Sequence, residues 1–113
     1  MSAILLKLQP NQDVTEALET AVRDAGMERA RIVAAVGSLV EAVVQSPKGL
    51  EVVPGPAIEV AALTGEVCAN GCSRLHGYMI RQDTGVVHGD LVRGRNAVGV
   101  TFELLLTSMD GAR

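Results

Sequence analysis

A single amphipathic segment, residues 13–26, is the feature that most limits what this chain can fold into. Its apolar residues recur with the period of an α-helix and form one stripe: Val14, Ala17, Leu18, Ala21, Val22 and Ala25. Asp13 is placed to cap the helix by accepting a hydrogen bond from the Glu16 amide, while the Glu16 carboxylate reaches back to the Asp13 amide. Gly26 is placed to end it, because glycine readily adopts the left-handed conformation that closes a helix. The pattern predicts one helix between Asp13 and Gly26.

The rest of the chain has the pattern of short strands, because its apolar segments are separated by Gly, Pro, Asn and Asp. About seven strands are predicted, at residues 3–8, 30–44, 50–53, 57–67, 74–82, 86–91 and 97–108. Residues 30–44 are too long for one flat strand, so we expect a bend or bulge at Gly37-Ser38. Residues 57–67 also fit a helix, but Gly65 and the preceding Pro54-Gly55-Pro56 favour a strand.

Turn sequences between these strands indicate that most neighbours are joined as hairpins. Asn70-Gly71 is the strongest hairpin signal, and Asp83-Thr84-Gly85 and Arg93-Gly94-Arg95-Asn96 supply further turns. Two strands joined by a hairpin run antiparallel. The predicted fold class is therefore α+β, a mostly antiparallel sheet of about seven strands with one main helix packed on it.

The composition is apolar for so short a chain. Its 113 residues suit one domain with one core, so we expect a single domain over residues 1–113. Apolar residues make up 48% of the sequence, mean hydropathy is +0.27, and Tyr78 and Phe102 are the only aromatic residues. A domain of this size cannot easily hide so much aliphatic surface, and we therefore expect the subunits to associate.

The charge balance is acidic, with 10 Lys and Arg against 13 Asp and Glu and a formal net charge of −3. Non-specific DNA binding relies on basic side chains that neutralise phosphates, so we expect the protein by itself to bind DNA weakly, if at all. No 18-residue apolar run and no secretory leader are found, which predicts a cytoplasmic protein with no membrane partner. In a reducing compartment, Cys68 and Cys72 are expected to be thiols.

Stretches along nearly the whole chain resemble the plants-and-prokaryotes-conserved (PPC) domain, also called the AT-hook-associated conserved domain. They are residues 8–14 (Leu-Gln-Pro-Asn-Gln-Asp-Val), 35–38 (Ala-Val-Gly-Ser), 58–65 (Ile-Glu-Val-Ala-Ala-Leu-Thr-Gly), 75–91 (Leu-His … Asp-Thr-Gly-Val-Val-His-Gly-Asp-Leu) and 101–106 (Thr-Phe-Glu-Leu-Leu-Leu). They resemble, in order, the family's turn before the helix, its "AIGA/S" strand, its "E-x-L-S-L-x-G" strand, its "H-L-H … G-G-H-L" hairpin and its closing "T-A-E-V-V-L" strand. All five stretches occur in the family's order and spacing.

The resemblance implies an antiparallel sheet with one main helix, assembled as a homotrimer. Plant members carry separate AT-hooks and act on AT-rich DNA in the nucleus, and stand-alone prokaryotic members are often labelled DNA-binding by analogy. Some members look able to hold a metal with three histidines. At those three positions this chain has Arg74, His76 and Asp90, so only one of the histidines is kept.

The hairpin formed by the predicted strands 74–82 and 86–91 predicts a polar cluster on one face of the sheet. A loop at Asp83-Thr84-Gly85 places Gln82 opposite Val86 and Tyr78 opposite Asp90. The side chains that then share one face are Arg74, His76, Tyr78, His88 and Asp90. A two-residue loop would scatter them, but the family pattern supports the first register, because its three histidines must converge.

Three uses of this cluster stay open. Arg74 and Asp90 can form a charge-assisted pair within a structural network at a subunit interface. Alternatively, Arg74 can hold a small anionic ligand, with His76 as hydrogen-bond donor or base. A zinc site made from His76, Asp90 and His88 is less favoured, because Arg74 beside it would repel a divalent ion. No cofactor is expected.

Three neighbouring patterns invite a functional interpretation. Glu103, in an apolar strand, is either a pocket or interface carboxylate or a solvated one. Cys68 and Cys72, followed by His76, do not have the C-x-x-C spacing of a zinc motif, and the Asn70-Gly71 turn lies between the two cysteines. Arg93-Gly94-Arg95 is similar to the core of an AT-hook, but asparagine replaces the proline that should follow, so an ordinary turn is expected.

No catalytic motif is legible in the sequence. No serine has a nucleophile motif around it, and no glycine-rich phosphate loop follows a strand and opens a helix. We therefore expect a trimeric ligand-binding or regulatory module with a polar pocket near the subunit interfaces. A DNA-associated protein is the alternative. A small acid–base or metal-assisted enzyme, using His76 with Asp90 or Glu103, is a second alternative.

Overall fold

The computed structural model describes residues 2–81 and 85–111, which form one helix and a single eight-stranded sheet. In chain order the elements are β1 (Ala3–Leu8), α1 (Val14–Asp24), β2 (Arg29–Leu39), β3 (Ala42–Ser46), β4 (Gly49–Val53), β5 (Ile58–Cys68), β6 (Arg74–Arg81), β7 (Gly85–Leu91) and β8 (Val98–Ser108). The order across the sheet is β1-β8-β2-β5-β6-β7-β3-β4, and all of these neighbours are antiparallel. The predicted α+β class, with a mostly antiparallel sheet and one main helix, is confirmed.

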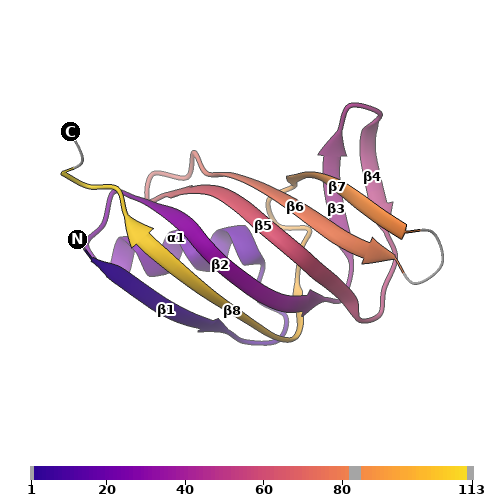
Figure 1. The fold of residues 1–113 in the computed structure, drawn as a ribbon, viewed down its shortest axis with the longest axis horizontal. Coiled ribbons are helices and arrows are strands. Elements are labelled where there is room, and N and C mark those ends of the chain that lie inside the picture. The colour runs from indigo at the N-terminus through magenta and orange to yellow at the C-terminus, as the bar shows by residue number, and fades with distance from the viewer. Residues whose placement is uncertain (1, 82–84, 112–113) are drawn as a thin grey trace.

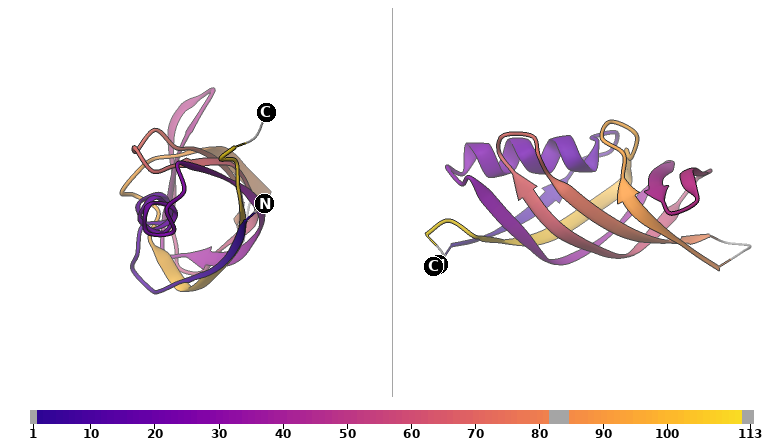
Figure 2. Two further views of the ribbon diagram at one scale, coloured as in Figure 1. Left: turned by 90° about the vertical axis from the view of Figure 1, so that its left-hand side faces the viewer. Right: turned by 90° about the horizontal axis from the view of Figure 1, so that it is seen from above.

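The sheet curls around α1, which lies along its concave side (Figures 1 and 2). Aliphatic side chains from both layers pack around Phe102 in the space between them, and this is the apolar core. The β3–β4 hairpin extends the sheet at the end opposite the two termini (Figure 1). Within the described part of the chain, no helix is long and apolar enough to cross a membrane.

The segment predicted as one bent strand, residues 30–44, is two strands in the structure. Gly37 lies against Phe102 so closely that an added Cβ would come within 2.6 Å of the Phe102 ring. The pairing of β2 with β8 shifts at this point, between Gly37 and Leu39. After the shift the chain leaves β2, and β3 pairs with β4 and β7 instead. At the expected bend the chain therefore leaves β2 and continues as β3, which lies between β7 and β4. This division of residues 30–44 into two strands accounts for the eighth strand.

The predicted ends of the helix are confirmed, but its buried face differs from the predicted stripe. The Glu16 amide donates to Asp13 Oδ2 at 3.1 Å, and Gly26 has a φ of 74°. No return bond from the Glu16 carboxylate forms within residues 2–81 and 85–111. The residues that α1 buries are Val14, Thr15, Leu18, Glu19 and Val22. The helix is thus rotated so that Thr15 and Glu19 are buried, whereas Ala17 and Ala21 are only partly buried and Ala25 is exposed.

Glu19 can be buried because its carboxylate is fully paired. The side chain of this residue is almost inaccessible, yet Arg93 donates hydrogen bonds to both carboxylate oxygens and the Ser73 hydroxyl donates a third at 2.6 Å. Arg93 also donates to the Gly71 carbonyl. Residues 93–95 form a turn after β7, as expected, and its first arginine joins α1 to the β5–β6 hairpin. This role for Arg93 was not predicted.

Asn96 is a second buried polar residue that the sequence pattern did not single out. Its side-chain amide donates to the carbonyls of Val43 and Val92, both at 3.0 Å, and its Oδ1 accepts from the Val43 amide. Its own amide donates to Asp13 Oδ1 at 2.9 Å. Asn96 therefore connects β3 to the start of the helix, and satisfies backbone groups that would otherwise be buried without partners.

We expect Arg93→Met to lower the free energy of unfolding at pH 7 by about 2 kcal/mol. This value lies between the typical costs of breaking a buried and an exposed ion pair, because Arg93 itself is half exposed while Glu19 is not. Urea unfolding measures it. The matched control is Arg95→Met, whose pair with Glu41 is exposed and 3.9 Å long, and which should cost under about 1 kcal/mol.

The same pair predicts a pH dependence. Burial raises the pKa of Glu19, but the hydrogen bonds from Arg93 and Ser73 outweigh burial and leave this pKa below its ordinary value of 4.5. A carboxyl with a lowered pKa stabilises the fold above its unfolded pKa, and the contribution is lost as pH falls through the lowered value. The difference in stability between the parent and Arg93→Met should therefore shrink as the pH falls below 4.5. A difference that is constant with pH would contradict this assignment.

Candidate functional site

The convex face of the sheet, opposite α1, carries the predicted polar residues. Leu75 and Met79 on β6 are buried, so the residues that alternate with them point outward. On β7 the buried Gly89 separates two outward-facing positions in the same way. We use the term outer-face cluster for the side chains brought together here: Arg74, His76, Tyr78, His88 and Asp90.

The pairing of β6 with β7 differs from the predicted register by two residues. His76 lies opposite Asp90 and Tyr78 opposite His88, whereas Tyr78 was expected opposite Asp90. Arg81 pairs with Gly85, so β7 begins one residue earlier than expected. An even shift keeps every side chain on its face, and for this reason the cluster still forms. The predicted position of Gln82 lies outside the described residues.

A chain of hydrogen bonds runs through the cluster. Nδ1 of His76 is 3.0 Å from Oδ1 of Asp90, and Nε2 of His76 is 3.0 Å from Nδ1 of His88. The Tyr78 ring stacks on His88, with ring centroids 5.1 Å apart and planes 20° from parallel. Both nitrogens of His76 are therefore occupied, and its ring is held between the two strands.

The predicted pair between Arg74 and Asp90 does not form. Asp90 bonds to His76 instead, because these two residues lie directly opposite each other and Arg74 lies two positions along β6. Across β5 the residue opposite Arg74 is Glu66, whose carboxylate is 3.3 Å from a nitrogen of Arg29. Over residues 2–81 and 85–111, Arg74 has no hydrogen bond or ion pair through its side chain.

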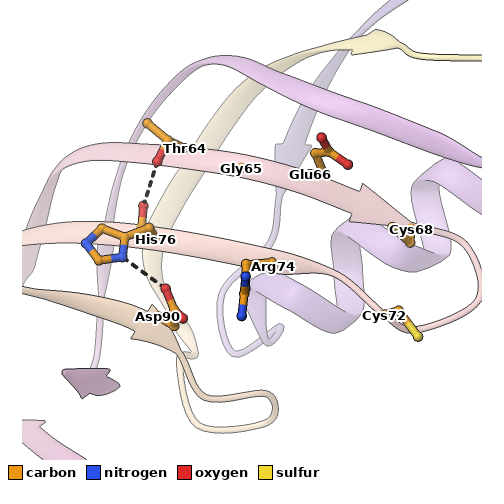
Figure 3. Close-up of a pocket in the computed structure, with 8 residues that line it drawn as sticks. All are labelled: Thr64, Gly65, Glu66, Cys68, Cys72, Arg74, His76 and Asp90. Atoms are coloured by element: carbon orange, nitrogen blue, oxygen red, sulfur yellow. Dashed lines mark hydrogen bonds and ion pairs between the residues drawn. The ribbon is translucent and has the colours of Figure 1, made fainter. Parts of the chain in front are cut away.

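Part of the cluster borders a shallow pocket of about 510 Å³ (Figure 3). Its lining residues are Thr64, Gly65, Glu66, Cys68, Cys72, Arg74, His76 and Asp90. Figure 3 shows Arg74 between the His76–Asp90 pair and the two cysteines. The carboxylates of Glu66 and Asp90 each have a partner, so the guanidinium of Arg74 is the charged group of this pocket that is left to bind a ligand.

On the β5 side of the pocket, the sequence pattern singled out Cys68 but neither Thr64 nor Glu66. Thr64 lies opposite His76, and its hydroxyl donates to the His76 carbonyl at 3.5 Å. Cys68 and Cys72 are both free thiols, and burial raises the pKa of Cys68. The hairpin signal at Asn70-Gly71 held enough information to find these residues, because it pairs β5 with β6.

Glu103 does not belong to this site. It lies on β8, and β2 and β5 separate β8 from β6, which places it about 14 Å away at roughly 4.8 Å per strand. Its side chain is exposed. Strand order is a property of the tertiary fold, so the alternation along β8 could not show this separation.

A metal site is not supported by the positions of the described side chains. No group of three or more His, Cys, Asp or Glu in this part of the chain is arranged to hold a metal ion. The two histidines hydrogen-bond to each other, and Asp90 accepts from His76. His76, His88 and Asp90, the weak metal candidates, therefore form a network of their own.

Comparison with known proteins gives a family match and several similar folds. A family model described as the Plants and Prokaryotes Conserved (PCC) domain matches residues 1–110, and no match is found among curated proteins. A structure of a hypothetical protein from Salmonella enterica has a TM-score of 0.85 at 23% identity, covering 95% of this chain and 77% of that one. At this identity the likeness shows the fold alone.

Two further structures have different descriptions. A "putative DNA binding protein" from Bacteroides thetaiotaomicron has a TM-score of 0.79 at 18% identity, covering 96% of this chain and 78% of that one. A metal-containing protein from Archaeoglobus fulgidus has a TM-score of 0.74 at 20% identity, covering 96% and 79% of the two chains. What these proteins bind does not transfer at such identities, since one fold serves many functions.

We expect the double substitution Arg74→His and Asp90→His to create zinc uptake of about one ion per subunit, where the parent takes up none. The substitutions restore the three histidines that the family resemblance aligns, and remove the cation that repels a divalent ion. Elemental analysis after dialysis against zinc measures both proteins. Arg95→His, which adds a histidine away from the pocket, is the control. One zinc per subunit in the parent would contradict the prediction.

Proposed function

The chain belongs to the Plants and Prokaryotes Conserved (PCC) domain family, and on that premise we propose that it is a homotrimeric module that binds a small anion in the pocket beside Arg74. The observation that carries the proposal is the Arg74 guanidinium, which has no internal partner in the described chain and lies in a pocket of about 510 Å³. A guanidinium presents a planar set of donors that fits a carboxylate or phosphate.

The surroundings of Arg74 set the charge of the ligand. Glu66 and Asp90 line the same pocket, and although both have partners they disfavour a ligand with several negative charges. The two thiols and Gly65 form an uncharged part of the wall beside the guanidinium. A singly charged carboxylate or phosphate diester is therefore the class of ligand that suits this pocket.

Arg74→Gln should weaken the binding of acetate by at least about tenfold, because it removes the positive charge and its charge-assisted bonds while keeping a polar side chain. Shifts of the Thr64 and Glu66 amide signals during an NMR titration report the affinity. The matched control is Arg95→Gln, which removes the same charge from a residue that does not line this pocket. Equal affinities in the parent and both variants would contradict an anion site at Arg74.

The homotrimer is supported by the family resemblance and by the apolar side chains that the single chain leaves exposed. The most exposed of these are Leu5 at 77%, Val100 at 73%, and Val36 and Leu50 at 65% each. Leu5 and Val36 lie on the convex face with the outer-face cluster, where their neighbours across the strands are Leu105 and Glu103. Covering such a surface is a common reason for subunits to associate.

We expect light scattering at micromolar concentration to give three chains of 11.8 kDa each, about 35 kDa in total. The mass should stay constant on tenfold dilution, since an interface that covers apolar side chains of this size is expected to be stable. A mass of 11.8 kDa, that of the single chain, would contradict the trimer.

DNA binding is the alternative function, and two of the similar structures are described as putative DNA-binding proteins. The charges of this chain favour it less, since acidic residues outnumber basic ones and the net charge is −3. Arg93, the first residue of the segment similar to an AT-hook, is bonded to Glu19 and Gly71 and so cannot enter a minor groove without breaking those bonds.

A further inference from the structure

The hydrogen bonds of the outer-face cluster determine where the protons of its two histidines lie. An ionised carboxylate only accepts, so Asp90 requires a hydrogen on Nδ1 of His76. Neutral His76 then has an unprotonated Nε2, which accepts from Nδ1 of His88 at 3.0 Å. His88 must therefore carry its hydrogen on Nδ1. Neutral His88 then has an unprotonated Nε2, whose lone pair is not used in the bonds that join Asp90, His76 and His88.

The geometry of the imidazole ring directs this lone pair away from His76. Nδ1 of His88 is engaged on the β6 side of β7, so Nε2 lies on the side of the ring that faces away from β6. β3 is the other neighbour of β7, and its hairpin with β4 lies on that side. A second hollow, of about 400 Å³, lies there, and its lining includes Ser46, Lys48, Glu51, Val86 and His88.

We propose that this hollow is a second binding site, for a small molecule that carries one negative charge close to a hydroxyl or amino group. Lys48 supplies the positive charge, and Nε2 of His88 accepts the hydrogen bond from the donor group of the ligand. Glu51 in the same lining disfavours a second negative charge. Short hydroxy acids have this combination of groups. The site goes beyond the Arg74 pocket and does not depend on it.

The remaining contacts hold the two binding groups in place. Ser46 Oγ accepts from the Lys48 amide at 3.1 Å and donates to the Gly49 carbonyl at 3.3 Å, which fixes the turn that carries Lys48. The stacked Tyr78 ring sets the plane of His88. Asp90 and His76 are positioning residues here, because they set the position of the hydrogen on His88 and do not themselves line the hollow.

Glycolate and acetate are suitable probes, because they share a carboxylate and differ by one hydroxyl. Nitrogen-15 spectra of the imidazole rings near pH 8 should show the hydrogen of His88 on Nδ1. Glycolate should shift the His88 signals at concentrations about tenfold lower than acetate does, which is the effect of one hydrogen bond to a well-placed acceptor.

Three variants separate the contributions. His76→Phe removes the acceptor that keeps the hydrogen of His88 on Nδ1, and it should therefore abolish the preference for glycolate. Lys48→Gln, at an exposed position, should weaken both probes about tenfold, and it serves if His76→Phe does not fold. Arg74→Gln is the matched control and should leave the His88 response unchanged, so that a failure of the Arg74 pocket is distinguished from a failure of this site. A hydrogen on Nε2 of His88 in the parent, or equal responses to glycolate and acetate, would overturn the proposal.

Discussion

The buried carboxylate of Glu19 is the contact through which α1 is held to two separate parts of the sheet. Arg93 and Ser73 bond to it, and Arg93 also bonds to the Gly71 carbonyl. The turn after β7 and the hairpin between β5 and β6 are thus attached to one point on the helix. A charge in this position is stable only when all of its bonds are made, so the contact also specifies how these parts are arranged. The strands that carry the outer-face cluster start or end at these turns.

The curved sheet has the apolar core on one side and the polar outer-face cluster on the other. The concave side holds α1 (Figure 2) together with the aliphatic side chains of the core, whereas the convex side presents the outer-face cluster. Alternation along β6 places Leu75 and Met79 inward and their neighbours outward, so the core and the candidate sites are built from the same strands. A shift of one residue between β6 and β7 would exchange the two faces, and the buried residues therefore determine the position of the cluster.

The polar groups of the convex side differ in whether they have partners. Asp90 and both nitrogens of His76 are engaged with each other and with His88, which makes this part of the cluster a framework. The proposed binding groups lie at its two ends, with Arg74 in one pocket and His88 in the other. In the proposals above, the two pockets share a hydrogen-bonded chain and differ in the cation that each offers, Arg74 or Lys48. An arginine suits a planar anion, and a lysine acts as a point charge.

The ends of α1 at Asp13 and Gly26, most strand positions and the family could be predicted from the sequence, because these depend on local periodicity, on turn residues and on motif order. The sequence also predicted that the cluster shares one face of the sheet, since successive side chains of a strand point to opposite faces whichever strand it pairs with. The sequence did not predict that residues 30–44 form two strands, that Glu103 lies far from His76, or that Arg93 bonds to Glu19. These depend on contacts between distant segments, whose order and exact register are chosen by packing of the whole core. The sequence pattern within one segment therefore does not predict the strand order or the exact register.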